Sequence, residues 1–310
     1  MGRRDGGVLP RVSAASASAG GGRGAGRARR HARGRLVLAV VVVIVGLVVA
    51  VLSWLHSRPV GPGAYPGPEG APGRAGTWRL AFADDFNGGH LDTNKWTTAF
   101  PWGPHSDTTP NAVYRRGNVT VADGMVRLRA DPDPAGEKPF TSGMISTGGA
   151  DGGRPAFAFT YGFMEIRAQL PDAHRAWPAF WTLSADGDWP PEIDVMENFG
   201  HEPNRHDMHF HYLDPKGAIR DDGAVWEGPD FTSGFHTFGV SWAPDAIRWY
   251  VDGVQRRAPF IQRQFIPSRP MYLLANLQVG GRQPGKYAGV AGAPSTLTID
   301  YIRVWSRAGS

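Results

Sequence analysis

Residues 77–306 alternate between short apolar runs and turn-forming Gly, Pro, Asp and Asn, which is typical of a β protein. Runs rich in β-branched and aromatic residues occupy 118–130, 161–170, 236–254 and 295–305. Asp-Gly pairs at 123–124 and 252–253 stand where hairpins would reverse. The pattern predicts an all-β sandwich or jelly roll over 77–306, whose concave sheet would suit an extended ligand.

The first 76 residues follow a different pattern. Residues 1–35 are mostly Gly, Ala, Ser and Arg, so we expect a disordered segment. Residues 36–55 are apolar without a charge and are long enough to span a bilayer. Because arginines precede them, we expect a signal-anchor helix with residues 1–35 in the cytoplasm and the β domain outside the cell membrane. Secretion after signal cleavage is the alternative. A Pro/Gly-rich linker, residues 56–76, would separate anchor and domain.

The charge distribution and the absence of cysteine exclude several classes of function. Residues 1–35 hold nine arginines and one acid, a surplus larger than the +5 of the whole chain, so the remainder is net acidic. An acidic domain without a basic stripe argues against a nucleic-acid partner. The absence of cysteine excludes disulfides, thiolate metal sites and thiol nucleophiles. The 11 tryptophans suit either a large core or a sugar-binding surface.

The segment EIDVME places three carboxylates, Glu192, Asp194 and Glu197, on one predicted strand. In a regular strand Glu197 would point away from the other two. A β-bulge at Val195 or Met196 would return it to their face. Two carboxyl groups about 5 Å apart are what a retaining glycosidase needs, here with Glu192 as nucleophile and Glu197 as acid/base. Asp194 would hydrogen-bond the nucleophile. An acidic strand edge or a Ca²⁺ site would give the same spacing.

EIDVME also resembles the E-x-D-x-x-E signature of glycoside hydrolase family 16, the laminarinase and lichenase group of concanavalin-like jelly rolls. The likeness extends, in order, through residues 82–96, 142–146, 159–171, 176–183, 235–253, 271–281 and 299–305. The resemblance implies a concanavalin-like β-sandwich and assigns Glu192, Asp194 and Glu197 the nucleophile, assisting and acid/base roles. It implies no organic cofactor. It leaves room for a structural Ca²⁺, although no ligand cluster in the sequence demands one.

Seven further residues are predicted to bind substrate. They are Trp177, Trp181, Trp189, His211, Asn111, Asn276 and Gln278. Trp181 and Trp189 match positions where the family stacks a sugar, with core packing as the alternative. For Asn276 and Gln278 the alternative role is to satisfy backbone groups. His209 and His211 alternate onto one face, but no third well-placed ligand suggests zinc, so we predict no metal there. The resemblance makes His211 the histidine beside the catalytic residues.

Two departures from the family lie where the sugar chain would enter. Pro191 stands where many laminarinase-like members have Gly, and the Asn-rich loop is reduced to TTPNAVYRR, which keeps Asn111.

The sequence as a whole predicts a monomeric retaining endo-β-glycanase that hydrolyses a β-linked polysaccharide, a 1,3- or 1,3/1,4-β-glucan. Another β-glycan or exopolysaccharide, transglycosylation, and a non-catalytic lectin are the alternatives.

Overall fold

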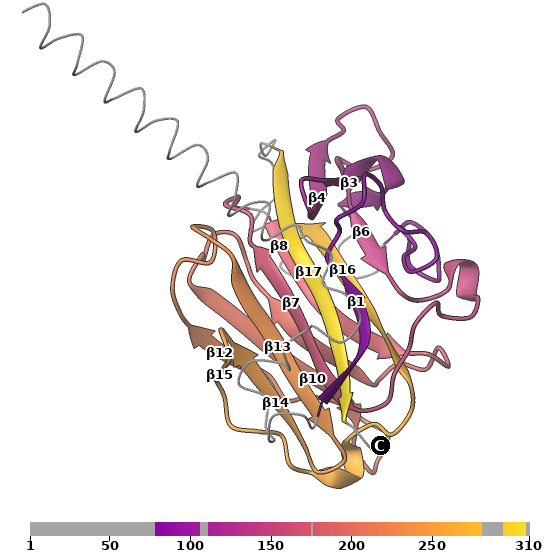
Figure 1. Cartoon of the computed structure of the whole chain (residues 1–310), viewed down its shortest axis with the longest axis vertical. Coiled ribbons are helices and arrows are strands. Elements are labelled where there is room, and N and C mark those ends of the chain that lie inside the picture. The colour runs from indigo at the N-terminus through magenta and orange to yellow at the C-terminus, as the bar shows by residue number, and fades with distance from the viewer. Residues whose placement is uncertain (1–77, 106–110, 175, 281–293, 308–310) are drawn as a thin grey trace, which may run out of the picture. The chain divides into compact units, whose positions relative to one another are not determined.

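A computed structural model describes residues 78–105, 111–174, 176–280 and 294–307, which form two packed β-sheets (Figure 1). The predicted cytoplasmic segment, the anchor at 36–55 and the linker lie outside these residues. Within the described ranges, no helix is long and apolar enough to cross a membrane.

The larger sheet has ten strands. They are β1 (Trp78–Asp84), β2 (Ala112–Tyr114), β3 (Val119–Ala122), β4 (Met125–Pro132), β5 (Phe140–Ser142), β7 (Gly162–Gln169), β13 (His236–Ala243), β14 (Ala246–Val251), β15 (Val254–Gln255) and β17 (Ser295–Arg307). Their order is β15-β14-β13-β7-β17-β4-β5-β2, with β1 paired to β17 and β3 to β4. The long β17, yellow in Figure 1, therefore joins elements from both ends of the domain.

The second sheet has seven strands and carries the site described below. They are β6 (Met144–Ser146), β8 (Ala176–Ser184), β9 (Glu192–Glu197), β10 (Arg205–Leu213), β11 (Ile219–Asp221), β12 (Ala224–Glu227) and β16 (Met271–Val279). Their order is β11-β10-β9-β8-β16-β6, and β12 also pairs with β10. The helices of the described chain are 3₁₀ turns, η1 (Arg116–Asn118), η2 (Ala150–Gly152) and η3 (Arg263–Phe265).

The two Asp-Gly pairs form the predicted hairpin turns. Asp123 and Gly124 link β3 to β4 with φ values of 56° and 71°, and Asp252 and Gly253 link β14 to β15 with 49° and 72°. Positive φ at both central residues is the geometry of a type I′ turn, whose twist matches that of the strands. Local turn chemistry therefore sets the register of both hairpins.

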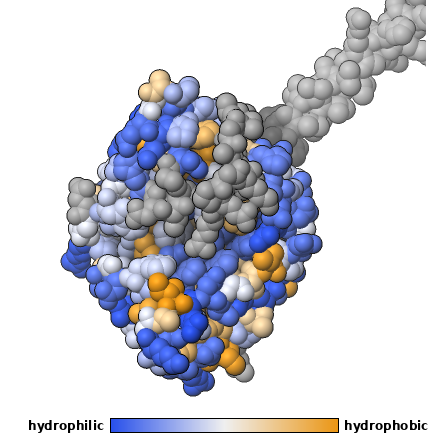
Figure 2. Space-filling model, turned by 180° about the vertical axis from the view of Figure 1, so that it is seen from behind, coloured by the Kyte–Doolittle hydropathy of each residue, from blue (hydrophilic) through white to orange (hydrophobic). Residues whose placement is uncertain are grey.

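One hydrophobic core lies between the sheets. Ile166 and Phe238 of the larger sheet and Phe180 and Met196 of the second sheet belong to the same buried cluster. This arrangement confirms the predicted all-β sandwich. The surface in Figure 2 is mostly polar, with apolar residues in small separate patches. Burial of alternate strand positions thus leaves the other faces of the strands available for polar chemistry.

Candidate active site

Strand β9 contains the bulge that the sequence predicts. Adjacent residues of β8 pair with Met196 and Asp194, so Val195 is the extra residue of β9. Val195 and Met196 both pack into the core. The bulge therefore restores Glu197 to the face of Glu192 and Asp194.

We call this outer surface of the second sheet the carboxylate face. Its members come from β8, β9, β10 and β16 and are Trp177, Trp181, Glu192, Asp194, Glu197, Asp207, His209, His211, Asn276 and Gln278. Asp207, His209 and His211 of β10 lie in register with Glu197, Asp194 and Glu192 respectively. Each carboxylate of β9 therefore has a titratable neighbour on the adjacent strand.

Glu192 and Asp194 share one polar cluster. The indole of Trp189 donates a 2.7 Å hydrogen bond to Glu192. The Nε2 atom of His211 lies 3.9 Å from Glu192 Oε1 and 3.4 Å from Asp194 Oδ2. Burial, followed by the charge of Asp194, raises the pKa of Glu192 well above its usual value. Burial, followed by the charge of Glu197, raises the pKa of Asp194 well above its usual value. Because the pKa of each of these neighbouring carboxyls is raised, the pair favours a state that holds one proton.

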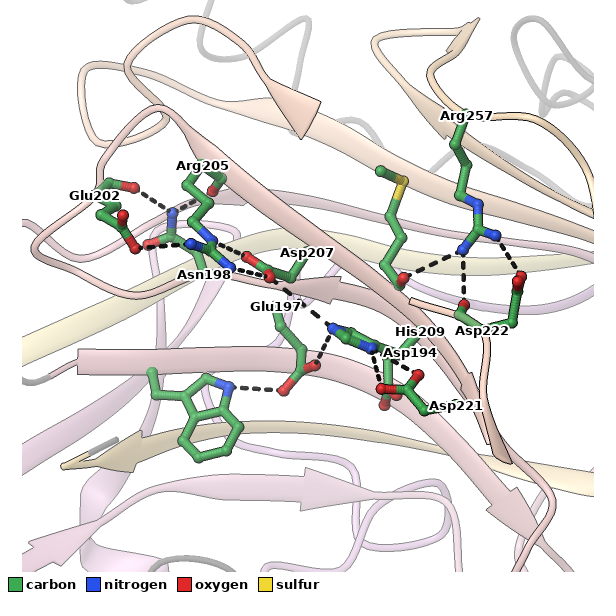
Figure 3. A network of polar contacts seen from close by, with 12 residues as sticks. Asp194, Glu197, Asn198, Glu202, Arg205, Asp207, His209, Asp221, Asp222 and Arg257 are labelled. Carbon is green, nitrogen blue, oxygen red and sulfur yellow. Dashed lines mark hydrogen bonds and ion pairs between the residues drawn. The ribbon is translucent and has the colours of Figure 1, made fainter. Parts of the chain in front are cut away.

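Glu197 contacts different partners through its two oxygens. Trp177 Nε1 donates a 2.7 Å hydrogen bond to Oε1, and His209 Nε2 lies 3.8 Å from Oε2 (Figure 3). Glu197 therefore lies between an indole donor and an imidazole, whereas Asp194 is buried. The two carboxyls on either side of the bulge have distinct environments, which is what separate acid/base and assisting roles require.

The three predicted tryptophans differ in exposure. Trp189 is 50% exposed, Trp177 is 5% exposed and Trp181 is half-buried. The Trp181 indole donates a 2.7 Å hydrogen bond to Asn276 Oδ1, and Asn276 donates one of 3.3 Å to the hydroxyl of Tyr114. Trp189 is thus placed to stack on a ligand, while Trp177 orients Glu197.

The amide side chains that were predicted to bind substrate mainly hold other groups of the site in place. Asn276 is fully buried and Gln278 is 6% exposed. Asn111 donates a 3.2 Å hydrogen bond to the carbonyl of Val279. Burial of Asn276 and Gln278 favours the supporting role over direct contact with sugar hydroxyls.

An exposed aromatic residue escaped the sequence prediction. Trp102 is 52% exposed and stacks on Phe100 with 4.8 Å between ring centroids and 5° between planes. Phe100 lies 6.3 Å from Trp181. The buried Phe100 ring therefore lies between the exposed Trp102 and Trp181. Trp102 lies between Pro and Gly in a segment without strand periodicity, so nothing in the sequence separated it from a packing residue.

The histidines of β10 divide between the two faces, as alternation predicts. His206 is fully buried and packs against Phe238 with 5.1 Å between ring centroids. His209 and His211 stack on the carboxylate face, with centroids 5.9 Å apart and planes at 4°.

Two groups of side chains within the described ranges have metal-ligand spacing. They are His209 with His211 and Asp221, and Glu192 with Asp194 and His211. In both groups the imidazole nitrogens already face carboxylates. The structural Ca²⁺ stays a prediction.

The packed sheets and the bulged carboxylate strand define a class of carbohydrate-active β-sandwiches. The family model of glycosyl hydrolases family 16 matches residues 107–303. The chain belongs to this family.

Relatives and solved structures agree with the assignment. The chain is 33% identical over 247 residues to endo-1,3-1,4-beta-glycanase EglC of Rhizobium meliloti (strain 1021), covering 73% of this chain and 51% of that protein. It is 30% identical over 259 residues to a beta-glucanase of Rhodothermus marinus, covering 75% and 86%. The laminarinase catalytic domain of Thermotoga maritima MSB8 superposes with a TM-score of 0.63 at 27% identity, covering 75% of this chain and 99% of that domain. The chain spans about half the length of the first curated relatives it matches.

Proposed function

We propose that this chain is a retaining endo-β-glucanase that hydrolyses a 1,3- or mixed 1,3/1,4-linked β-glucan. The observation that carries the proposal is the bulge at Val195, because it gathers three carboxyl groups on the outer face of the second sheet. The relatives named as β-glycanases and β-glucanases support the substrate class.

In the first step, the Glu192 carboxylate attacks the anomeric carbon as the glycosidic bond breaks, and the leaving oxygen takes the proton of Glu197. In the second step, Glu197 accepts a proton from water, whose oxygen attacks the same carbon and releases Glu192. Asp194 holds a proton toward Glu192, which its raised pKa supports. Trp189 and Trp181 would stack on the sugar rings on either side of the reacting bond.

The charges beside the site favour a neutral glycan. Arg205 and His209 pair with Asp207 and Asp221 respectively. Cations with carboxylate partners are poorly suited to bind sulfate or uronate groups. One relative named for keratan sulfate is only 26% identical, and a sulfated polymer is therefore the second substrate to test.

The test incubates the full-length chain with linear β-1,3-glucan, mixed-linked β-glucan and a sulfated galactan. We expect falling viscosity and new reducing ends on the neutral glucans, with the β-anomer formed first in ¹H NMR. An α-anomer as first product would contradict the double displacement. Binding without turnover would indicate a lectin, and products longer than the substrate would indicate transglycosylation.

Two variants separate the proposed roles of the glutamates. Glu192→Ala should abolish turnover while polysaccharide binding persists, and azide should then yield an α-glycosyl azide from an activated substrate. Glu197→Ala should instead yield the β-glycosyl azide, because the glycosyl-enzyme still forms with a good leaving group. The same azide anomer from both variants would remove these assignments.

We further propose that residues 36–55 anchor the chain in the cell membrane with the β domain outside. The uncharged apolar run and the arginines that precede it support this topology. Protease added to intact cells should remove the β domain and leave a membrane-bound N-terminal fragment. Recovery of the whole domain in the medium would favour the secreted form.

A further inference from the structure

His209 faces carboxylates through both ring nitrogens. Its Nδ1 atom lies 2.9 Å and 3.1 Å from the two oxygens of Asp221. Its Nε2 atom lies 3.8 Å from Glu197 Oε2 and 3.9 Å from Asp207 Oδ1. Figure 3 shows the imidazole of His209 between these three side chains. An imidazole that faces acceptors at both nitrogens is best satisfied as the doubly protonated cation.

Asp207 is kept ionised by a cation on its other side. The guanidinium of Arg205 donates hydrogen bonds of 2.6 Å and 2.7 Å to the two oxygens of Asp207 and one of 3.3 Å to Glu202. Although burial opposes the charge, these bonds lower the pKa of Asp207 below its usual value. Charges of alternating sign therefore run from Glu202 through Arg205 and Asp207 to His209 (Figure 3).

The segment between β11 and β12 holds the other side of the imidazole. A side-chain carbon on Gly223 would lie only 2.6 Å from His209 Nδ1, so the backbone closes directly over the ring. Arg257 anchors this segment through hydrogen bonds to the carbonyl and carboxylate of Asp222 and to the carbonyl of Met208. Backbone therefore covers one side of the His209 ring, although its side chain stays 21% exposed.

We propose that His209 is a positioning residue for the reaction proposed above, whose imidazolium faces Glu197 and favours the carboxylate form of this acid/base group. The inference rests on the proposed function. Burial opposes a charge on His209, but the nearby carboxylates of Asp207 and Asp221 outweigh it and raise its pKa to about 10. The cation therefore persists across the neutral range.

The remaining groups around Glu197 explain why a cation is useful there. The pair of Glu192 and Asp194 on β9 carries one negative charge when it holds one proton, and this charge opposes ionisation of Glu197. Trp177 of β8 donates to one oxygen, while Asp207 and His209 approach from β10. Asp221 and the stacked His211 face the imidazole itself. Because Glu197 must cycle between acid and base, a nearby cation offsets the repulsion that would hold it protonated.

The test compares pH profiles of kcat/KM for the full-length chain and His209→Gln. With a β-1,3-glucan oligosaccharide as substrate, the alkaline limb of the kcat/KM profile reports loss of the proton from Glu197, the proposed acid. Without the cation, Glu197 should keep its proton to higher pH, so the limb should move up by about one pH unit. His209→Lys should retain the wild-type limb because it keeps the charge. Arg220→Gln, a charge removal on the adjacent strand β11, serves as the matched control and should leave the limb unchanged.

An activated substrate separates action through Glu197 from a general structural effect. A dinitrophenyl glycoside needs no proton on its leaving group, so His209→Gln should not move the alkaline limb for this substrate. Equal shifts for both substrates, or no shift for the unactivated one in a folded variant, would overturn the proposal.

A second measurement tests the proposal even if His209→Gln fails to fold. In the wild-type protein, imidazole NMR signals of His209 should show the cation through pH 9, and a neutral ring at pH 8 would overturn the proposal. This readout needs no turnover. A wild-type chain inactive on every glycan would therefore refute the proposed function without deciding the state of His209.

Discussion

The indole nitrogen of Trp177 donates a 2.7 Å hydrogen bond to Glu197 Oε1. Trp177 is only 5% exposed, so it contributes an oriented donor rather than a stacking surface. The bond fixes the carboxyl of Glu197 just beyond the bulge. Trp177, which the sequence predicts to bind sugar, thus orients the proposed acid/base group.

Removing this donor should impair turnover more than stability. Trp177→Phe keeps an aromatic ring but loses the hydrogen bond to Glu197, and we expect kcat/KM to fall about ten- to hundredfold. Steady-state kinetics on β-1,3-glucan oligosaccharides check this. Trp305→Phe is the matched control, because the Trp305 indole nitrogen finds no hydrogen-bond partner among the described residues. Equal losses in both variants would contradict a specific role for the bond.

Asn276 should matter for stability as well as binding. Asn276→Leu would leave the Trp181 indole and the Tyr114 hydroxyl without their present partner. We expect the free energy of unfolding to fall by about 1–3 kcal/mol, and KM to rise because Trp181 loses its orientation. Denaturant unfolding and kinetics measure the two effects. Exposed Asn94→Leu should change neither, and wild-type values for Asn276→Leu would refute the supporting role.

Trp102 is expected to bind the more distant part of a long substrate. Trp102→Ala should raise KM for long oligosaccharides about two- to tenfold through lost stacking, with little change for short ones. Stability should hold because the ring is 52% exposed. Ile261→Ala is a suitable control, since Ile261 is 64% exposed and follows Phe260, which pairs with Ile247 of the other sheet. A uniform change across chain lengths would contradict the prediction.

The local sequence was sufficient to predict the bulge in β9, the two hairpin turns and the alternation on β10. The odd spacing between Asp194 and Glu197 required one extra residue for a common face, and the register places it at Val195. The Asp-Gly pairs likewise specified their hairpins, because few residues tolerate positive φ at two successive positions. Alternation on β10 also separated His206 from His209.

Sequence could not reveal interactions between distant segments. The partners of His209 include Asp221, which lies on a different strand, and the space for its ring depends on Gly223. Asn276 meets Trp181 only because β16 pairs with β8. Spacing along one strand carries no information on such neighbours, so the charge environment of the site required the three-dimensional structure.

His206 should make the protein sensitive to acid. Burial lowers the pKa of His206 to about 3, against about 6.5 in the unfolded chain. The stability that the neutral His206 ring contributes is fully present above pH 6.5. As pH falls from 6.5 toward 3, the free energy of unfolding drops by about 1.4 kcal/mol per pH unit, because only the unfolded chain takes up the proton. Between pH 8 and 4.5 the wild type should therefore lose about 2–3 kcal/mol more unfolding free energy than His206→Phe. Denaturant unfolding across this range measures the difference. Phe231→Leu, a packing change beside His206, should shift the curve without altering its slope, whereas parallel curves for wild type and His206→Phe would contradict the prediction.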